Sequence, residues 1–222
     1  MADTRFKICC IQDEIEARLA IELGASAIGL VSRMPSGPGP ISIEQIATIV
    51  RSLRATNHVV DTFLLTCETS AETVIEQLQQ TLCNTVQLCD AMQGVFEYGK
   101  IREAMPNVRI VQVIHVEDEI ALDEAFRAQD HVDALLLDSG RPNAAIKELG
   151  GTGRAHDWTL SRRIVGQSKV PVYLAGGLNA ENAQQAIRDV GPYALDVCSG
   201  VRTDGKLDRT KLEAFARAIA AA

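Results

Sequence analysis

The sequence is poor in aromatic residues and carries no excess of positive charge. Aromatic residues make up 4% of the 222 residues, and tryptophan occurs once. The 22 lysines and arginines are outnumbered by 29 aspartates and glutamates, which gives a formal net charge of -7. A protein that binds nucleic acid needs a basic face. We therefore expect no nucleic-acid partner.

Long apolar runs are also missing. No run approaches the roughly 20 residues that a helix needs to cross a bilayer, so we expect no membrane partner. The N-terminus lacks the charged-then-apolar pattern of a signal peptide. The six cysteines include no Cys-x-x-Cys pair. We interpret them as reduced thiols in a cytoplasmic protein.

Short apolar runs alternate with amphipathic stretches along the chain. Continuous apolar runs are typical of parallel strands that are buried on both faces. The predicted strands are Phe6–Ile11, Ala27–Val31, Val59–Leu65, Thr85–Cys89, Arg109–Ile114, Ala134–Asp138, Val172–Ala175 and Ala194–Cys198. The predicted helices are Asp13–Leu23, Ile43–Arg54, Ala71–Thr81, Gly94–Met105, Asp118–Gln129, Trp158–Gln167, Ala180–Val190 and Thr210–Ala221.

This alternation predicts the α/β class. Strands separated by helices indicate a parallel sheet, and eight such units indicate that the sheet closes. We therefore predict a single-domain (β/α)8 TIM barrel over residues 1–222. An open doubly wound sheet is the alternative. It usually has fewer strands, and a dinucleotide-binding version needs a glycine fingerprint that the segment Cys9–Gln12 does not supply.

Residues 139–157 form a predicted active-site lid after the sixth strand. They show no periodic pattern and contain Pro142 and four glycines. A structureless stretch of this length in a compact domain is usually a lid or a binding loop. Lys147, Arg154 and His156 could reach an anionic ligand from it. A flexible insertion without function is the alternative.

Two glycine turns follow the seventh and eighth predicted strands. Gly176 and Gly177 lie in the first turn, and Gly200 lies in the second. Without side chains, their backbone N–H groups can approach an anion closely. In (β/α)8 barrels this position commonly binds phosphate. The turns therefore predict a phosphate site, and they identify the functional face of the barrel.

Catalytic groups in such barrels lie at the C-terminal ends of strands. Cys9 ends the first predicted strand and Asp138 ends the sixth, on opposite sides of the barrel. A thiolate can remove a proton from carbon, and a carboxylic acid in a partly apolar site can protonate an oxygen. We interpret them as a base and an acid. Strand packing for Cys9 and loop capping for Asp138 are the structural alternatives.

Five segments resemble the motifs of the phosphoribosylanthranilate isomerase family, in order and with matching spacing: Lys7–Ile11, Leu135–Ser139, Gly150–Trp158, Leu174–Asn182 and Asp196–Val201. The resemblance implies a barrel enzyme of tryptophan biosynthesis. Such an enzyme carries out an Amadori rearrangement, which opens the ribose ring of N-(5-phosphoribosyl)anthranilate and moves the carbonyl to C2′.

The resemblance also implies the roles of individual residues. Cys9 matches the general base that takes the C2′ proton, and Asp138 matches the general acid for the ring oxygen. No cofactor or metal is implied. The expected partner is a small phosphoribosyl substrate, and the expected assembly is a monomer or homodimer. The predicted substrate-binding residues are Gly151, Gly176, Gly177, Asn179, Ser199, Gly200, Arg33 and Arg154.

The chain departs from the family pattern on the same face. Cys10 replaces the usual glycine after the catalytic cysteine. Gly39 stands where the family has an arginine that holds the anthranilate carboxylate. Cys89-Asp90 replaces a usual His-Gly, and Arg202 stands where glutamate is common. Loss of one charge-assisted hydrogen bond costs roughly 1.5–3 kcal/mol, unless a neighbouring cation such as Arg33 replaces it.

These departures leave other interpretations open. The substrate could be a different phosphoribosyl amine, although the histidine-pathway isomerase generally uses an aspartate where this chain has Cys9. The barrel could bind a phosphoribosyl group without turnover. Soft thiolates with an imidazole also suit zinc, and the candidate ligands are Cys9, Cys67, Cys89, Cys198 and His115.

Overall fold

The computed structural model describes residues 4–56, 58–140 and 158–222. Eight parallel strands, β1 to β8, form a closed barrel in which each strand pairs with its sequence neighbours and β1 pairs with β8. The strands are β1 Arg5–Ile8, β2 Ala27–Val31, β3 Asp61–Thr66, β4 Thr85–Leu88, β5 Arg109–His115, β6 Ala134–Asp138, β7 Val172–Leu174 and β8 Ala194–Val197.

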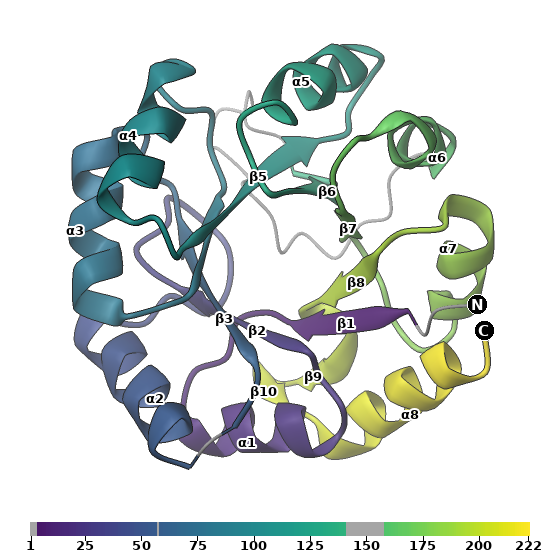
Figure 1. Cartoon of the computed structure of the whole chain (residues 1–222). Helices are drawn as coiled ribbons and strands as arrows, with labels where there is room; N and C mark the ends of the chain where they lie inside the picture. Colours follow the sequence, from purple (N-terminus) through teal and green to yellow (C-terminus); the bar gives the residue numbers. More distant parts are fainter. Residues whose placement is uncertain (1–3, 57, 141–157) are drawn as a thin grey trace.

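The helices follow the strands in turn and surround the barrel as a ring (Figure 1). They are α1 Glu14–Glu22, α2 Ile43–Ala55, α3 Ala71–Thr81, α4 Phe96–Ala104, α5 Ile120–Ala128, α6 Trp158–Gln167, α7 Ala183–Val190 and α8 Arg209–Ala220. The predicted (β/α)8 TIM barrel is confirmed. In the described part of the chain, no helix has the length and apolarity to span a membrane.

Capping residues fix several helix starts. Ser42 and Gln45 form a reciprocal capping box at α2, and the side chain of Ser70 accepts from the N–H of Thr73 at α3. Such caps satisfy backbone N–H groups that have no partner within the helix. Gly24 lies just beyond the end of α1 with φ +93° and lets the chain turn towards β2.

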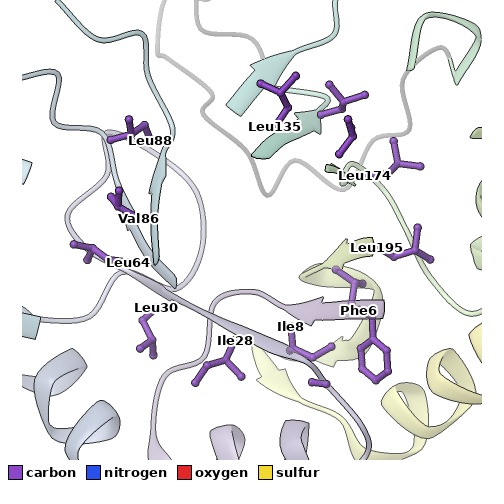
Figure 2. Close-up of a cluster of buried hydrophobic side chains, with 14 of the residues drawn as sticks. Phe6, Ile8, Ile28, Leu30, Leu64, Val86, Leu88, Leu135, Leu174 and Leu195 are labelled. Atoms are coloured by element: carbon purple, nitrogen blue, oxygen red, sulfur yellow. The ribbon is translucent and has the colours of Figure 1, made fainter. Parts of the chain in front are cut away.

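Side chains alternate between the two faces of each strand, as the period of two requires. Figure 2 shows Phe6 and Ile8 of β1 pointing away from the barrel towards the surrounding helices, together with Ile28, Leu64 and Leu195 from other strands. The residues between them face inward. Buried inward-facing residues include Ala27, Val31, Phe63, Leu65, Val111, Leu136 and Tyr173.

A buried ion pair lies inside the barrel where β1 meets β8. Lys7 and Asp196 are register partners, and Lys7 Nζ lies 2.8 Å from Asp196 Oδ1. Lys7 is 0% exposed. Burial alone lowers the pKa of Lys7, but the charge and hydrogen bond of Asp196, together with Cys9 and Cys10, raise this pKa overall. The lysine therefore stays charged in the barrel interior.

Several element boundaries differ from the sequence-based expectations, and one pair of strands was not expected. The first strand was expected to run to Ile11, but β1 ends at Ile8. Cys10 has φ +62°, in the left-handed region, which a regular strand cannot continue through. A short antiparallel hairpin, β9 Arg202–Thr203 and β10 Lys206–Leu207, was not predicted. Its strands have two residues each, too few to show a period. A 3₁₀ turn, η1 Ser199–Val201, precedes it.

The Lys7–Asp196 pair makes a strong prediction for stability. Lys7→Met leaves the Asp196 carboxylate buried without a counter-charge, so the free energy of unfolding should fall by about 3–5 kcal/mol. The double variant Lys7→Met/Asp196→Asn should lose much less than the sum of the two single variants. Urea unfolding followed by circular dichroism measures all three.

Lys169→Met, which breaks an exposed pair with Asp130, is the control, and it should lower the free energy of unfolding by at most about 1 kcal/mol. If the losses of unfolding free energy in the two single variants add up in the double variant, the interaction between Lys7 and Asp196 is contradicted.

Candidate active site

A cavity opens at the C-terminal ends of the strands. Its walls come from β1 to β4 and β6 to β8, or from the segments that follow these strands, and contain both predicted catalytic residues. Cys9 and Asp138 line it together with the predicted phosphate residues Gly176, Gly177 and Ser199. The other lining residues are Cys10, Val31, Met34, Ser36, Gly37, Pro38, Leu65, Gln87, Cys89, Ala175, Leu178, Asp196 and Cys198. The structure therefore brings a thiol, a carboxyl group and two glycine-containing turns into one space.

Cys9 lies immediately after β1 and faces inward. Its backbone N–H donates to Val197 O at 2.8 Å, which fixes the residue against β8. The side chain is 8% exposed. Gly29 of β2 makes room for it, because a Cβ at position 29 would come within 3.2 Å of Cys9 Sγ. The buried ammonium of Lys7 interacts electrostatically with Cys9. The thiolate is the form of a cysteine that acts as a base or nucleophile.

Asp138 ends β6 and also faces inward, with 7% of its surface exposed. Its Oδ1 accepts a hydrogen bond from the backbone N–H of Ser139 at 2.7 Å. Burial raises the pKa of Asp138, and the opposing effects of the Ser139 N–H and the His115 charge do not cancel this rise. A carboxyl group whose pKa is raised keeps its proton to higher pH and can donate it as a general acid.

In the two glycine turns, after β7 and after β8, the backbones pack closely against each other. Gly176 and Gly177 have φ values of +88° and +65°, which favour glycine. At Gly200 a Cβ would lie 1.9 Å from Leu178 O, so only glycine lets the turn after β8 pack against the turn after β7. Asn179 shapes the first turn, because its Oδ1 accepts from the backbone N–H groups of Glu181 and Asn182.

In the described part of the chain, the structure does not place the remaining predicted binding residues at the cavity. Arg33 follows β2 but is exposed and absent from the cavity wall. Its backbone carbonyl accepts a hydrogen bond from Cys67 Sγ at 3.2 Å. Gly151 and Arg154 lie outside the described residues, as does most of the predicted lid, residues 141–157.

Three polar residues near the cavity were missed by the sequence analysis. Asp196 and Gln87 line the wall, and Lys7 lies beneath Cys9 with Asp196 as its partner. Gln87 is buried, and its Oε1 has no hydrogen-bond partner among the described residues, so it offers an acceptor to a ligand. The signal for all three was present in the sequence. Each is a polar residue inside an otherwise apolar strand, at an inward-facing position.

Two departures from the family pattern are explained by one contact. Cys10 stands where a glycine is usual, and it adopts the left-handed conformation that favours glycine, with φ +62°. Gly39 replaces the usual arginine, and a Cβ built at Gly39 would lie 2.6 Å from Cys10 Cβ. Gly39 also has φ +84°. A side chain at position 39 is therefore incompatible with the side chain at position 10.

Arg202, the third departure, anchors the loop that carries Cys9. Its guanidinium pairs with both carboxylate oxygens of Glu16, at 2.9 Å and 2.8 Å. It also donates to Cys10 O at 2.5 Å. Burial alone would raise the pKa of Glu16, but hydrogen bonds from Arg202 and the Leu207 N–H lower it overall. The buried pair ties the loop after β1 to the hairpin after β8.

The candidate zinc ligands do not form a metal site in the described part of the chain. Within residues 4–56, 58–140 and 158–222, no cluster of three or more His, Cys, Asp or Glu side chains is placed to hold a metal ion. His115 instead contacts Cys89 through the backbone, with its Nε2 3.1 Å from Cys89 O.

The contact between positions 10 and 39 predicts a thermodynamic coupling. Gly39→Ala should lower the free energy of unfolding by roughly 1–3 kcal/mol through overpacking and left-handed strain. In a Cys10→Gly background the overpacking disappears, so part of this loss should be recovered, with a coupling energy of about 0.5–3 kcal/mol. Urea unfolding of the four proteins in the cycle measures the coupling.

Gly205→Ala is the matched control for this cycle. Gly205 has φ +77°, but a Cβ there meets nothing within 4 Å. Gly205→Ala should therefore lower the free energy of unfolding through left-handed strain alone, and by the same amount whether position 10 is Cys or Gly. If the loss of unfolding free energy in Gly39→Ala is also the same with Cys or Gly at position 10, the contact between positions 10 and 39 is ruled out.

Comparison with known proteins places the chain in a family. Residues 6–218 match the family model described as N-(5'phosphoribosyl)anthranilate (PRA) isomerase. N-(5′-phosphoribosyl)anthranilate isomerase 1 of Methanosarcina mazei is 33% identical over 96% of this chain and 93% of its own length. The corresponding protein of Nitrosococcus oceani is 35% identical over 97% of each chain.

Solved structures agree with these relatives. The crystal structure of phosphoribosyl anthranilate isomerase from Thermotoga maritima superposes with a TM-score of 0.82, at 28% identity, over 99% of this chain and 100% of that one. A second isomerase structure, in complex with reduced 1-(o-carboxyphenylamino)-1-deoxyribulose 5-phosphate, superposes with a TM-score of 0.80 at 26% identity, over 99% and 100% of the two chains. The chain belongs to the N-(5′-phosphoribosyl)anthranilate isomerase family.

Proposed function

We propose that this protein isomerises N-(5′-phosphoribosyl)anthranilate, the Amadori rearrangement of tryptophan biosynthesis. One observation carries the proposal: Cys9 and Asp138 line the same cavity as the glycine turns at Gly176, Gly177 and Ser199. A base for carbon, an acid for oxygen and a site for an anion are the three parts that this reaction needs. Family membership supplies the substrate class.

Two proton transfers in the reaction need a catalytic group. Asp138 donates its proton to the ribose ring oxygen, the bond from that oxygen to C1′ breaks, and the amine nitrogen and C1′ form a protonated imine. Cys9 thiolate removes the proton from C2′, which gives a neutral enol-amine; the enol oxygen then loses its proton and C1′ gains one, which gives the C2′ ketone. Two groups on different sides of one sugar can carry out both transfers without a cofactor.

The substrate has a phosphate at one end and the anthranilate carboxylate at the other, and each end needs its own binding residues. The phosphate lies at the turns after β7 and β8, held by Gly176, Gly177, Ser199 and Gly200, with Asn179 shaping the first turn. The anthranilate carboxylate needs a cation from a position other than Gly39. Arg33 and Arg154 are the candidates, and Gly151 is a further predicted binding residue close to Arg154 in the sequence. The protein works as a monomer or homodimer in the cytoplasm.

Turnover should depend on Cys9 and Asp138 separately. Cys9→Ala and Asp138→Asn should each lower kcat by about 10²–10⁴-fold, because each removes a proton-transfer group. KM should change little, since neither residue holds the phosphate. A fluorescence assay of phosphoribosylanthranilate consumption, beside growth rescue of a strain that lacks the isomerase, measures both effects.

Cys67→Ser is the matched control for these variants. Cys67 also follows a strand on the same rim, but it does not line the cavity, so its variant should retain wild-type kcat. Full activity of Asp138→Asn would contradict the acid assignment. Wild-type protein that binds the substrate without forming product would favour a non-catalytic barrel.

The raised pKa of Asp138 also predicts a pH-dependent stability difference. The folded state keeps this carboxyl protonated at a pH where the unfolded chain ionises it. As the pH rises from the ordinary aspartate pKa to the raised folded pKa, the wild type therefore loses stability. Asp138→Asn, which cannot ionise, lacks this loss. In urea unfolding across this window, the stability of Asp138→Asn relative to wild type should increase with pH; a decrease would contradict the shift.

A further inference from the structure

Three thiols lie together at the mouth of the cavity. Cys10 Sγ lies 2.8 Å from Cys198 Sγ and 3.7 Å from Cys9 Sγ. Cys10 is buried, whereas Cys198 is partly exposed, and both line the cavity. The reaction proposed above uses Cys9 and has no role for the other two. An adjacent pair of unused thiols, one of them reachable from solvent, calls for its own explanation.

The backbone holds the pair in place. Cys10 follows β1 and Cys198 follows β8, and these two strands are paired through Ile8 and Val197. Arg202 further fixes the Cys10 carbonyl. A disulfide has an S–S length of about 2.05 Å. The sulfurs need to approach by less than about 1 Å, which side-chain rotation can supply without moving the strands.

The surroundings make the two thiols unequal. The hydrogen bond with Cys10 lowers the pKa of Cys198, and the positive charge of Arg202 lowers it further against the opposing effect of burial. The hydrogen bond with Cys198 raises the pKa of Cys10, as do the neighbouring Cys9 and burial. Cys198 is therefore the more acidic thiol of the pair, and Cys10 is the less acidic one. A low-pKa thiol beside a second cysteine is the arrangement of oxidation-sensitive sites.

We propose that Cys10 and Cys198 are a redox-active pair, which a peroxide converts into a reversible disulfide at the cavity mouth. The Cys198 thiolate attacks one peroxide oxygen, the O–O bond breaks, and the departing hydroxide takes a proton to leave as water. Cys198 is then a sulfenic acid. The Cys10 sulfur attacks the Cys198 sulfur, the S–O bond breaks, and the hydroxyl group leaves with the Cys10 proton as a second water.

The electrons balance, because two thiols lose two hydrogens and one peroxide is reduced to two waters. A small thiol reductant reverses the reaction by thiol–disulfide exchange. The bridge joins the residue after Cys9 to the residue before Ser199. It therefore links the loop of the candidate base to the candidate phosphate turn, while Cys9 stays reduced.

Thiol mapping of the full-length protein tests the proposal without reference to isomerase activity. The protein is treated with a small excess of hydrogen peroxide, its free thiols are alkylated, and its peptides are analysed by mass spectrometry. The expected product has lost two hydrogens and retains four alkylatable thiols of the six in the chain. A peptide carrying Cys10 should be cross-linked to one carrying Cys198, and dithiothreitol should restore all six.

Variants identify the sulfurs. Cys198→Ser and Cys10→Gly should each abolish the bridge, and Cys10→Gly restores the residue that is usual in the family. Cys9→Ser should retain the bridge. This result would show that Cys10, and not Cys9 in the same peptide, is the bridged residue. Cys67→Ser should also retain it. A bridge that persists in Cys10→Gly, or conversion of Cys198 to sulfinic acid without any bridge, would overturn the proposal.

Discussion

The pairing of β1 with β8 is the constraint on which the site depends. It closes the barrel and brings the first and last parts of the chain into register, so that Lys7 meets Asp196 in the interior. Cys9 lies two residues after Lys7, and its backbone N–H donates a hydrogen bond to Val197 O, one residue after Asp196. The same register sets Cys9 beside the turn that begins at Ser199. Closure therefore places the candidate base, its buried positive neighbour and the phosphate turn together.

Three of the chain's departures from the family pattern, at Cys10, Gly39 and Arg202, are connected through contacts. A thiol at position 10 takes the space that a side chain at position 39 would need. Arg202 then holds the Cys10 carbonyl and pairs with Glu16, which links this loop to the hairpin after β8. We infer that the loops around Cys9 have been rebuilt as a unit. The positions of Cys9, Asp138 and the glycine turns within the barrel remain those that the motifs imply.

Much of the architecture was accessible from the sequence, because strands buried on both faces appear as continuous apolar runs. All eight strands and the shared rim of Cys9 and Asp138 follow from that pattern. The end of β1 was not accessible, since the left-handed conformation of Cys10 depends on packing against Gly39 and Arg202. The Lys7–Asp196 pair was missed for a similar reason. Its partners are 189 residues apart, and only closure brings them together.

The central claim is that a thiol and a carboxyl group act on one sugar across the cavity. A crystal structure of this protein with the reduced product analogue, 1-(o-carboxyphenylamino)-1-deoxyribulose 5-phosphate, tests it most directly. The account predicts C2′ within about 3–3.5 Å of Cys9 Sγ, the former ring oxygen in hydrogen-bond contact with Asp138, and the phosphate on the turns at Gly177 and Ser199. A ligand seated there with either side chain turned away from the sugar would contradict it.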